Sequence, residues 1–393
     1  MNQWKMVSLD TMGVVSRGKS KHRPRNDARL YGGKYPFIQT GDIGSAGLYV
    51  VNYSQTYNEV GLAQSKLWDK DTLCITIAAN IADTALLAFP ACFPDSIMGF
   101  VPYENISNVK FVKYCFDILK QDCKQISQGT AQDNLSWKKL STIQFPCPPL
   151  PTQHRIASIL SRYDSLIENY QHQIKLLEEA AQRLYKQWFV DLKFPGYEKT
   201  VFVDGIPQGW ERKAISQLGE YLNGFAFKPS DWQKSGKPII KIKEMGNGVG
   251  EDTPRNKGER VPDKYLVKAG DLLFSWSATL MVIVWSGEDG WLNQHLFKVT
   301  PIKGIGREFL LQSISNTIEE FQNLTTGSTM KHIQRNKLDQ VFVNVPNNEI
   351  MKKYNNIAEK ERAEILHLSL QIRHLTEARD RLLPKLMNGE IEV

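Results

Sequence analysis

The chain lacks the features that mark metal-binding, disulfide-bonded and membrane proteins. It has only five cysteines, and no two of them form a Cys-x-x-Cys pair with metal-ligand spacing. Its most apolar stretch, residues 272–285, is too short and too rich in serine to span a bilayer, and no segment resembles a signal peptide. We therefore expect a cytoplasmic protein with free thiols, no metal site and no membrane partner, in which residues 272–285 form a buried strand.

Motifs of catalysis are missing as well. The chain contains no Gly-x-Ser-x-Gly nucleophile elbow, no kinase signature and no His-Glu-x-x-His zinc motif. The Asp/Asn-Pro-Pro-aromatic motif of amino-methyltransferases is also absent, and the seven histidines are scattered. These absences predict a protein that binds rather than catalyses and that holds no cofactor of its own.

Positive charge is modest in total but gathers in a few segments. The net charge is +7, and one basic cluster spans residues 17–25, with others at 241–243, 255–260 and 331–337. Basic loops of this kind suit contacts with nucleic-acid phosphates. Ordinary solvated loops are also often basic, so charge alone leaves both interpretations open.

Residues Gly13–Ser20 (GVVSRGKS) match the phosphate-binding P-loop pattern letter for letter. A working P-loop follows a buried apolar strand and opens a helix, so that backbone amides converge on phosphate. Here residues 4–12 are interrupted by polar side chains, and residues 21–27 have the composition of a basic loop. We therefore favour a phosphate-contacting loop for DNA over a site of nucleotide hydrolysis.

The second half of the chain is a weak copy of the first, displaced by about 200 positions. Trp4 corresponds to Trp210 at an offset of 206, and the Arg-Leu pair at 183–184 returns at 381–382, an offset of 198. The drift in offset indicates loop insertions. A duplicated module of this kind is typical of a protein that binds a target with two parts.

Each copy begins with an α+β pattern and ends in a long amphipathic helix. The proline-rich segment 145–151 cannot continue a helix or a central strand, and Thr152 can cap a helix that runs to about Phe189, about 50 Å long. Pro384 is expected to end or kink the second helix. The predicted division is an α+β domain at 1–150, a central helix at 151–195, a second α+β domain at 196–345 and a C-terminal helix at 346–393.

Apolar side chains recur every seven residues along both helices and form one seam on each. Such a seam is longer than a typical helix of a globular protein, which has about 10–14 residues. We expect the two helices to pair as an antiparallel coiled coil; the alternative is that each helix packs only on its own domain. The predicted seam residues are Ile156, Leu160, Tyr163, Ile167, Tyr170, Ile174, Leu177, Leu184, Ile365, Leu368, Ile372, Leu375 and Leu382.

A Gly-Thr or Gly-Ser loop, a proline-rich exit and a long helix occur in order in each copy, although the second exit is reduced to residues 345–349. The residues concerned are Gly129, Thr130, Leu135, Leu140, Pro146–Ile156 and the helix to Leu184, with Pro207–Trp210 and Gly270–Leu273 in the second copy. With these features, the chain resembles, over essentially its whole length, the specificity subunit of a type I restriction-modification enzyme.

The resemblance implies two tandem α+β target-recognition domains in a pseudo-twofold arrangement, separated by the two long helices. Each domain would read one half of an asymmetric bipartite site in double-stranded DNA, while the helices set the half-site spacing and dock a pair of modification subunits. Those subunits would use S-adenosylmethionine to methylate adenine, and restriction subunits would use ATP and magnesium. No catalysis and no bound cofactor are implied for this chain.

We predict the DNA contacts from residue type and position in each copy. Arginine favours guanine edges, asparagine favours adenine, and lysine suits phosphates. The predicted DNA-contacting residues are Arg17, Lys19, Lys21, Arg23, Arg25, Thr76, Asn80 and Lys138 in the first copy, and Lys241, Lys243, Ser275, Trp276, Lys331, His332 and Arg335 in the second.

Two other functions stay open at this point. The chain could be a coiled-coil adaptor whose domains bind protein, or an NTPase that uses Gly13–Ser20. The salt dependence of binding separates the adaptor from a DNA reader, because phosphate neutralisation makes affinity fall steeply with salt. Replacing Lys19 tests the NTPase, because only an NTPase would lose nucleotide turnover when Lys19 is replaced.

Overall fold

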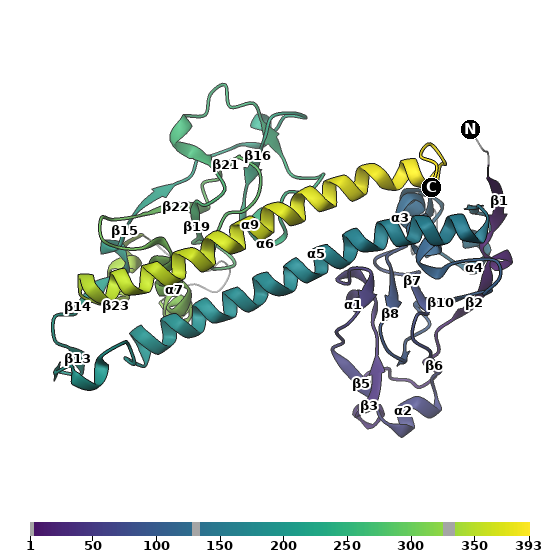
Figure 1. The fold of residues 1–393 in the computed structure, drawn as a ribbon, viewed down its shortest axis with the longest axis horizontal. Helices are drawn as coiled ribbons and strands as arrows, with labels where there is room; N and C mark the ends of the chain where they lie inside the picture. Colours follow the sequence, from purple (N-terminus) through teal and green to yellow (C-terminus); the bar gives the residue numbers. More distant parts are fainter. Residues whose placement is uncertain (1–3, 128–133, 325–334) are drawn as a thin grey trace. The chain divides into compact units, whose positions relative to one another are not determined.

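The computed structural model describes residues 4–127, 134–324 and 335–393 (Figure 1). The chain forms two compact units, the first from residues 1–169 with 373–393 and the second from residues 170–372. Each unit contains one α+β domain and a part of each long helix.

A five-stranded sheet forms the centre of the first domain. Its strands lie in the order β2-β10-β7-β8-β4, and every residue of β7 and β8 is buried. The helix α3 (Val109–Ser127) contributes Phe111 and Phe116 to the same core. Because both faces of these strands are covered, their sequences are continuous apolar runs. The strand bounds are β2 (Gly13–Arg17), β4 (Tyr49–Val50), β7 (Leu73–Thr76), β8 (Thr84–Leu87) and β10 (Ile97–Pro102).

Smaller elements complete the first domain. A four-stranded sheet has the order β5-β3-β9-β6, and β1 pairs with β11 in an antiparallel ribbon. The proline-rich exit supplies β11, an edge position that tolerates proline. The bounds are β1 (Lys5–Ser8), β3 (Tyr31–Phe37), β5 (Gln55–Tyr57), β6 (Leu67–Trp68), β9 (Ala91–Cys92), β11 (Gln144–Cys147), α1 (Thr40–Gly44), α2 (Glu59–Ala63), α4 (Trp137–Leu140), η1 (Leu9–Thr11) and η2 (Ala28–Leu30).

The second domain repeats this plan, except that its central sheet has no counterpart of β4. Its central sheet has the order β15-β22-β19-β20, its second sheet β17-β16-β21-β18, and β14 pairs with β23. The repeat seen in the sequence is therefore a repeat of structure. The bounds are β14 (Glu211–Ala214), β15 (Gly219–Asn223), β16 (Lys237–Ile240), β17 (Arg255–Asn256), β18 (Leu266–Val267), β19 (Leu272–Ser275), β20 (Met281–Val284), β21 (Gly290–Leu292), β22 (Leu296–Pro301), β23 (Phe342–Val345), α6 (Ile242–Asn247), α7 (Arg307–Asn316) and α8 (Ile318–Asn323).

Short elements fill the remaining connections of the second unit. A hairpin of β12 and β13 precedes the domain, and single helical turns lie between its strands. These are β12 (Phe202–Val203), β13 (Ile206–Pro207), η4 (Tyr197–Lys199), η5 (Ile215–Gln217), η6 (Pro229–Asp231), η7 (Asp263–Tyr265) and η8 (Arg335–Asp339).

Residues 272–285 form a hairpin and not the single buried strand that their composition predicts. The strands β19 and β20 pair antiparallel, with Ser275 opposite Met281. The chain reverses between them with Ala278 at a φ of 56°, a left-handed conformation that glycine or asparagine more often occupies. The turn therefore contains none of the residues by which a turn is usually predicted from sequence.

The first long helix, α5 (Leu150–Tyr185), begins two residues before Thr152, so the predicted Thr152 cap is wrong. The carbonyl of Pro149 accepts the amide of Thr152 at 2.9 Å. Pro151 lies in the first turn, where its missing amide leaves no bond unmade. The helix then continues as one π-helical turn, η3 (Lys186–Val190).

The second long helix, α9 (Asn348–Met387), begins where the side chain of Asn347 accepts the amide of Ile350 at 3.0 Å. Pro384 lies within the helix, in its last turn, so it does not end the helix there. The tail that follows turns back with Gly389 at a φ of 73°.

The two long helices pair antiparallel within each unit, as predicted. In the first unit, Leu386 of α9 belongs to the same core as Ile156 of α5. In the second unit, the ring of Trp188 lies 5.9 Å from that of Tyr354. In the first unit, Asp164 pairs with Arg379, and in the second, Glu178 lies near Arg362, so within each unit the residue number on α9 falls as that on the first helix rises. The pairs Ile156–Leu386 and Trp188–Tyr354 occupy equivalent positions of the repeat with the helices exchanged.

Charged side chains tie each domain to the long helices. In the second unit, Arg362 of α9 donates to Glu308 of α7 at 2.7 Å, and both side chains are almost fully buried. In the first unit, Asp164 of α5 accepts from Arg379 of α9 at 2.7 Å and from the hydroxyl of Tyr114 on α3. Burial beside Asp164 raises the pKa of Tyr114, which keeps its hydroxyl a donor.

All five cysteines are free thiols. Burial raises the pKa of Cys123 to about 11 and that of Cys74 further, so both are protonated at neutral pH. In the part of the chain that the structure describes, no helix is long and apolar enough to cross a membrane.

Candidate nucleic-acid interface

A row of basic side chains leaves the end of β2 in the first domain. Arg17, Lys19 and Lys21 are exposed, while Gly18 and Ser20 between them are buried, so the charged side chains share one face. The amide of Gly18 donates to the carbonyl of Ile97 at 2.8 Å, and a Cβ on Gly18 would lie 2.2 Å from the carbonyl of Pro94. Only glycine permits this close approach, which fixes the row against the turn at 93–97.

The same segment does not form a P-loop. Residues 13–17 are strand β2, paired antiparallel with β10, and the next elements are the 3-10 turn η2 at residues 28–30 and strand β3, so no α-helix starts at this segment. The amides of Gly18 and Lys19 donate to backbone carbonyls of Ile97 and Phe93. Because these amides are used within the fold, they cannot converge on a nucleotide phosphate.

The loop after the row is held by its own polar side chains. His22 and Asp27 are bonded at 2.8 Å, and Arg23 donates to the carbonyls of Ser20 and His22 at 2.7 and 2.8 Å. Hydrogen bonds from Arg29 and then from His22 hold the pKa of the Asp27 carboxyl well below its usual range. The charged loop is therefore shaped before any ligand arrives.

The turn at 93–97 brings a second loop to the same end of the sheet. The register places Met98 opposite Arg17 and Ile97 opposite Thr76. The amide of Ile77 also donates to the carbonyl of Ser96 at 3.0 Å. The basic row and the loop at 77–83 therefore flank the beginning of β10.

Within that loop, Thr76 and Asn80 have different roles. Thr76 is fully buried, and its hydroxyl bonds the carbonyls of Asn80 and Asp83 and accepts the amide of Asp83 at 3.0 Å. The prediction that Thr76 contacts DNA is therefore wrong, because its hydroxyl holds the turn. Asn80 is exposed and stays a predicted contact.

Lys138 lies near this loop on the short helix α4, and its side chain is exposed. Just before α4, the amide of Leu135 donates to the carbonyl of Ile77 at 2.9 Å. Seven of the eight predicted residues of the first domain lie in two segments, 17–25 and 76–83, that meet at one end of the sheet. Lys138, the eighth, follows Leu135, which is hydrogen-bonded to the second of these segments. Arg23 and Arg25 are exposed with the rest of the row.

In the second domain, Ser275 repeats the role of Thr76. It is fully buried, and its hydroxyl donates to the carbonyl of Thr279 and accepts the amide of Met281 at 2.9 Å. Its predicted DNA contact is likewise wrong. Trp276, the next residue, is half-buried, and its indole donates to Asn223 at 3.2 Å while its ring lies 6.0 Å from that of Phe297.

Two lysines lie beside this second turn, on the helix α6. Lys241 caps α6 and places its ammonium 4.7 Å from the ring centre of Trp232. Lys243 is exposed and paired with Asp252. Ile242 and Met281 belong to one core cluster, which sets α6 against the beginning of β20. Lys331 and His332 lie outside the described residues, as does the side chain of Arg335.

The predicted seam residues are all buried or half-buried. Ile156, Leu160 and Ile167 are buried on α5, and Ile365 and Leu368 are buried on α9. The half-buried ones are Tyr163, Tyr170, Ile174, Leu177, Leu184, Ile372, Leu375 and Leu382.

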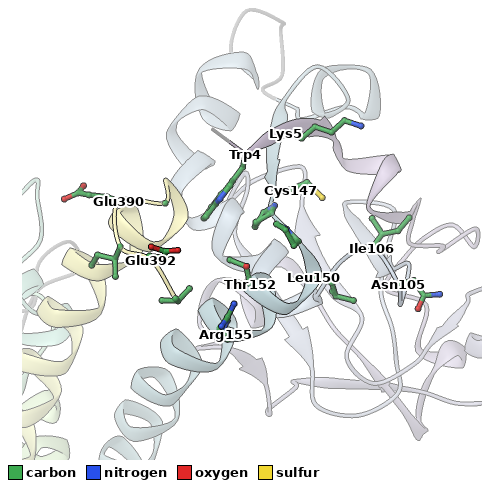
Figure 2. Close-up of a pocket in the computed structure, with 15 residues that line it drawn as sticks. Trp4, Lys5, Asn105, Ile106, Cys147, Leu150, Thr152, Arg155, Glu390 and Glu392 are labelled. Carbon is green, nitrogen blue, oxygen red and sulfur yellow. The ribbon is translucent and has the colours of Figure 1, made fainter. Parts of the chain in front are cut away.

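A large hollow of about 1130 Å³ lies in the first unit, between the start of α5, strand β1 and the C-terminal tail (Figure 2). Figure 2 shows Trp4 and Arg155 on one side and Glu390 and Glu392 on the other. Ile106, another lining residue, follows the end of β10, whereas the basic row meets the beginning of that strand. This hollow is therefore separate from the basic interface.

Sequence reasoning missed a smaller hollow of about 350 Å³ that adjoins the basic loop. Arg25 and Asn26 line it together with Gln39, Gln55 and Ser96, which come from three other segments. No local pattern joins these segments, so only the fold reveals the cluster.

Comparison with known proteins identifies the family of the chain. The family described as "Type I restriction modification DNA specificity domain" matches residues 1–179 and 207–377, once in each copy. The specificity subunit of the type I restriction enzyme MjaIX from Methanocaldococcus jannaschii is 23% identical over 99% of this chain and 94% of its own length. The HindI specificity subunit from Haemophilus influenzae is 24% identical over 100% of both chains.

A solved structure shares the fold. The crystal structure of the type I restriction-modification S subunit from M. genitalium covers 98% of this chain and 96% of its own, with a TM-score of 0.60 at 15% identity. Both copies of the repeat match the family, and the matches together span most of the sequence. The chain therefore belongs to the family of type I restriction-modification DNA specificity subunits.

Proposed function

We propose that this chain is the sequence-specific DNA-binding subunit of a type I restriction-modification complex and that each α+β domain reads one half of a bipartite target. The observation that carries the proposal is one domain plan, present twice, with different side chains at the same sheet end. The first domain presents the basic row at 17–25, and the second presents Lys241 and Lys243 of α6. Two unlike readers on one scaffold fit an asymmetric site.

The long helices would set the distance between the two half-sites. A protein with two recognition domains must hold them at a fixed distance, because the spacing of half-sites follows the DNA helical repeat of about 34 Å. The antiparallel pairing within each unit, with buried positions such as Leu160 and Leu368, provides the stiffness that such spacing needs.

Catalysis would belong to partner subunits. Modification subunits, two of them for a chain with two equivalent halves, would bind S-adenosylmethionine and methylate adenine. Restriction subunits would use ATP and magnesium. The use of the Gly18 and Lys19 amides within the fold supports a chain that does not itself turn over nucleotide.

Salt titration of DNA binding tests the proposal against the protein adaptor. The complex of this chain with its modification subunit would be measured as wild type and with Arg17, Lys19 and Lys21 replaced by alanine. Three lost phosphate contacts should lower the slope of log affinity against log salt by about 2 to 3. A matched control replaces Lys70, Lys199 and Lys303, which are exposed but lie away from the two loop-bearing sheet ends.

The control variant should keep the wild-type slope. An assembled complex that binds DNA weakly, with a slope near zero in all three forms, would contradict the DNA-reading function and favour the adaptor.

A further inference from the structure

The smaller hollow of the first domain is lined by both aromatic and polar residues. Phe37, which is buried, and Tyr31, which is half-buried, line it with ring centres 6.0 Å apart. Its other lining residues include exposed Arg25, Asn26 and Gln55 and half-buried Gln39, which we call its rim. Amide and guanidinium groups read base edges in DNA, and lysine contacts either phosphates or guanine.

Two of the amides form a coupled pair. Gln39 and Gln55 share a hydrogen bond of 2.8 Å between their side chains. Whichever amide donates, the pair is left with one free carbonyl oxygen and one free NH2 group. A neighbouring acceptor and donor complement the N6 and N7 positions of adenine in the major groove.

The rim groups are held in place by the fold. The backbone amide of Gln39 donates to Asp42 at 2.7 Å in the cap of α1, and Gln55 lies opposite Phe37 in the β3–β5 register. Arg25 donates to Asp95 at 2.5 Å and its carbonyl accepts the hydroxyl of Tyr31 at 2.6 Å. Such bonds reduce the entropy lost when the side chains meet a ligand.

The position of Gln39 has a counterpart in the second domain. Lys241 caps α6 in the same way, since its amide donates to Glu244 at 3.1 Å. Lys241 directly follows β16, and Gln39 lies two residues after the end of the equivalent strand β3. An amide in one domain and a lysine in the other would favour different bases, adenine and guanine. Lys241 is also one of the DNA contacts predicted from sequence.

We propose that the Gln39–Gln55 pair, at the rim of this hollow, determines specificity for an adenine in the half-site that the first domain reads. The proposal rests on the DNA-reading function proposed above. It assigns base recognition to the rim residues and phosphate contacts to the basic row. Arg25 belongs to both sets, because it lies in the basic row and lines the hollow.

Methylation mapping of DNA modified by the assembled complex tests this assignment. Genomic DNA from a methylation-free host would be sequenced for methyladenine with the wild-type chain, with Gln39→Ala and with Gln55→Ala. We expect discrimination at one base position of one half-site to fall about tenfold or more, as loss of a paired base contact implies. The other half-site and the spacer should not change.

Two further variants sharpen the result. Gln39→Lys, which copies the second domain, should alter the preferred base at that same position. Asn52→Ala is the matched control, because Asn52 is an exposed amide close to Gln55 in sequence that does not line the hollow. It should leave the motif intact.

An unchanged motif in both alanine variants would overturn the assignment. So would a uniform loss of methylation at all sites with no change of motif, because that pattern indicates a phosphate-contacting or structural role. Both results leave the bipartite reading of the wild type intact. If the wild-type complex gives no bipartite motif, the proposed function itself fails.

Discussion

Single hydroxyl groups support the strand-end loops of both domains. Thr76 and Ser275 are fully buried, and each bonds the carbonyl of the residue four positions on, Asn80 or Thr279. The neighbouring turns contain alanines with positive φ, Ala79 at 63° and Ala278 at 56°. The hydroxyls therefore hold a backbone conformation that alanine seldom adopts without such support.

Thr76→Val and Asn80→Ala should separate support from contact. Valine fills the same space but removes the bonds of the hydroxyl to the Asn80 and Asp83 backbone, whose groups keep hydrogen bonds to other backbone atoms. The free energy of unfolding should therefore fall by about 0.5–1.5 kcal/mol. Asn80→Ala should leave stability unchanged and weaken DNA binding. Denaturant unfolding and a DNA-binding titration measure the two effects, and the reverse pattern would contradict the assigned roles.

Lys19 decides between a phosphate contact on DNA and nucleotide hydrolysis. Lys19→Ala should reduce the salt slope of DNA binding by about 1, because one phosphate contact is lost. The isolated chain should show no steady ATP turnover in either form. Lys70→Ala, an exposed lysine ahead of β7, is the control for the slope. ATP turnover that disappears in Lys19→Ala would establish the NTPase.

At this scale, sequence reasoning predicted the exposure of charged side chains better than that of hydroxyl side chains. The basic row was visible because alternating exposed residues leave a pattern along one segment. Thr76 and Ser275 looked like contacts because they are polar and end a strand, and only the turn shows that their hydroxyls point inward. Gln39 and Gln55 lie 16 positions apart, and only the pairing of β3 with β5 joins them.

At the scale of elements, the long helices were predictable because a seven-residue period continues over many turns. The antiparallel pairing of the two helices was also predicted correctly, and each compact unit contains one domain with a part of both helices. The hairpin of β19 and β20 did not follow, because a turn through Ala278 has none of the glycine, proline or asparagine signals by which turns are recognised. The helix α5 begins two residues earlier than predicted, because proline is tolerated in the first turn of a helix.

The buried pair of Arg362 and Glu308 should be the strongest single link between the second domain and α9. Arg362→Ala removes two of the three side-chain hydrogen bonds to the buried Glu308 carboxylate and leaves only the one from Gln312 at 2.7 Å. The free energy of unfolding should fall by about 3–5 kcal/mol. Denaturant unfolding of the full chain measures it.

Arg381→Ala provides the matched control for that variant. Arg381 pairs with Glu377 on the exposed surface of the same helix, so its loss should change stability by less than about 1 kcal/mol. Equal effects of the two substitutions would show that the buried pair contributes no more than a surface pair.

For the whole molecule, the proposed spacing role of the helices predicts a change in target length. Seven residues inserted near Gln171 of α5 and near Gln371 of α9 preserve the seam register and lengthen both helices by about 10 Å. The spacer between half-sites should then grow by about three base pairs. Methylation mapping reads the spacer directly, and an unchanged spacer in an active complex would contradict the proposed role.

The most direct test of the account is methyladenine mapping of genomic DNA in a methylation-free host that expresses this chain with its modification subunit. The comparison is between the intact chain and one that lacks residues 200–345. The account predicts a motif of two specified halves separated by unspecified bases, with one half lost or altered by the deletion. An assembled complex that produces no motif, or a motif that survives the deletion unchanged, would contradict it.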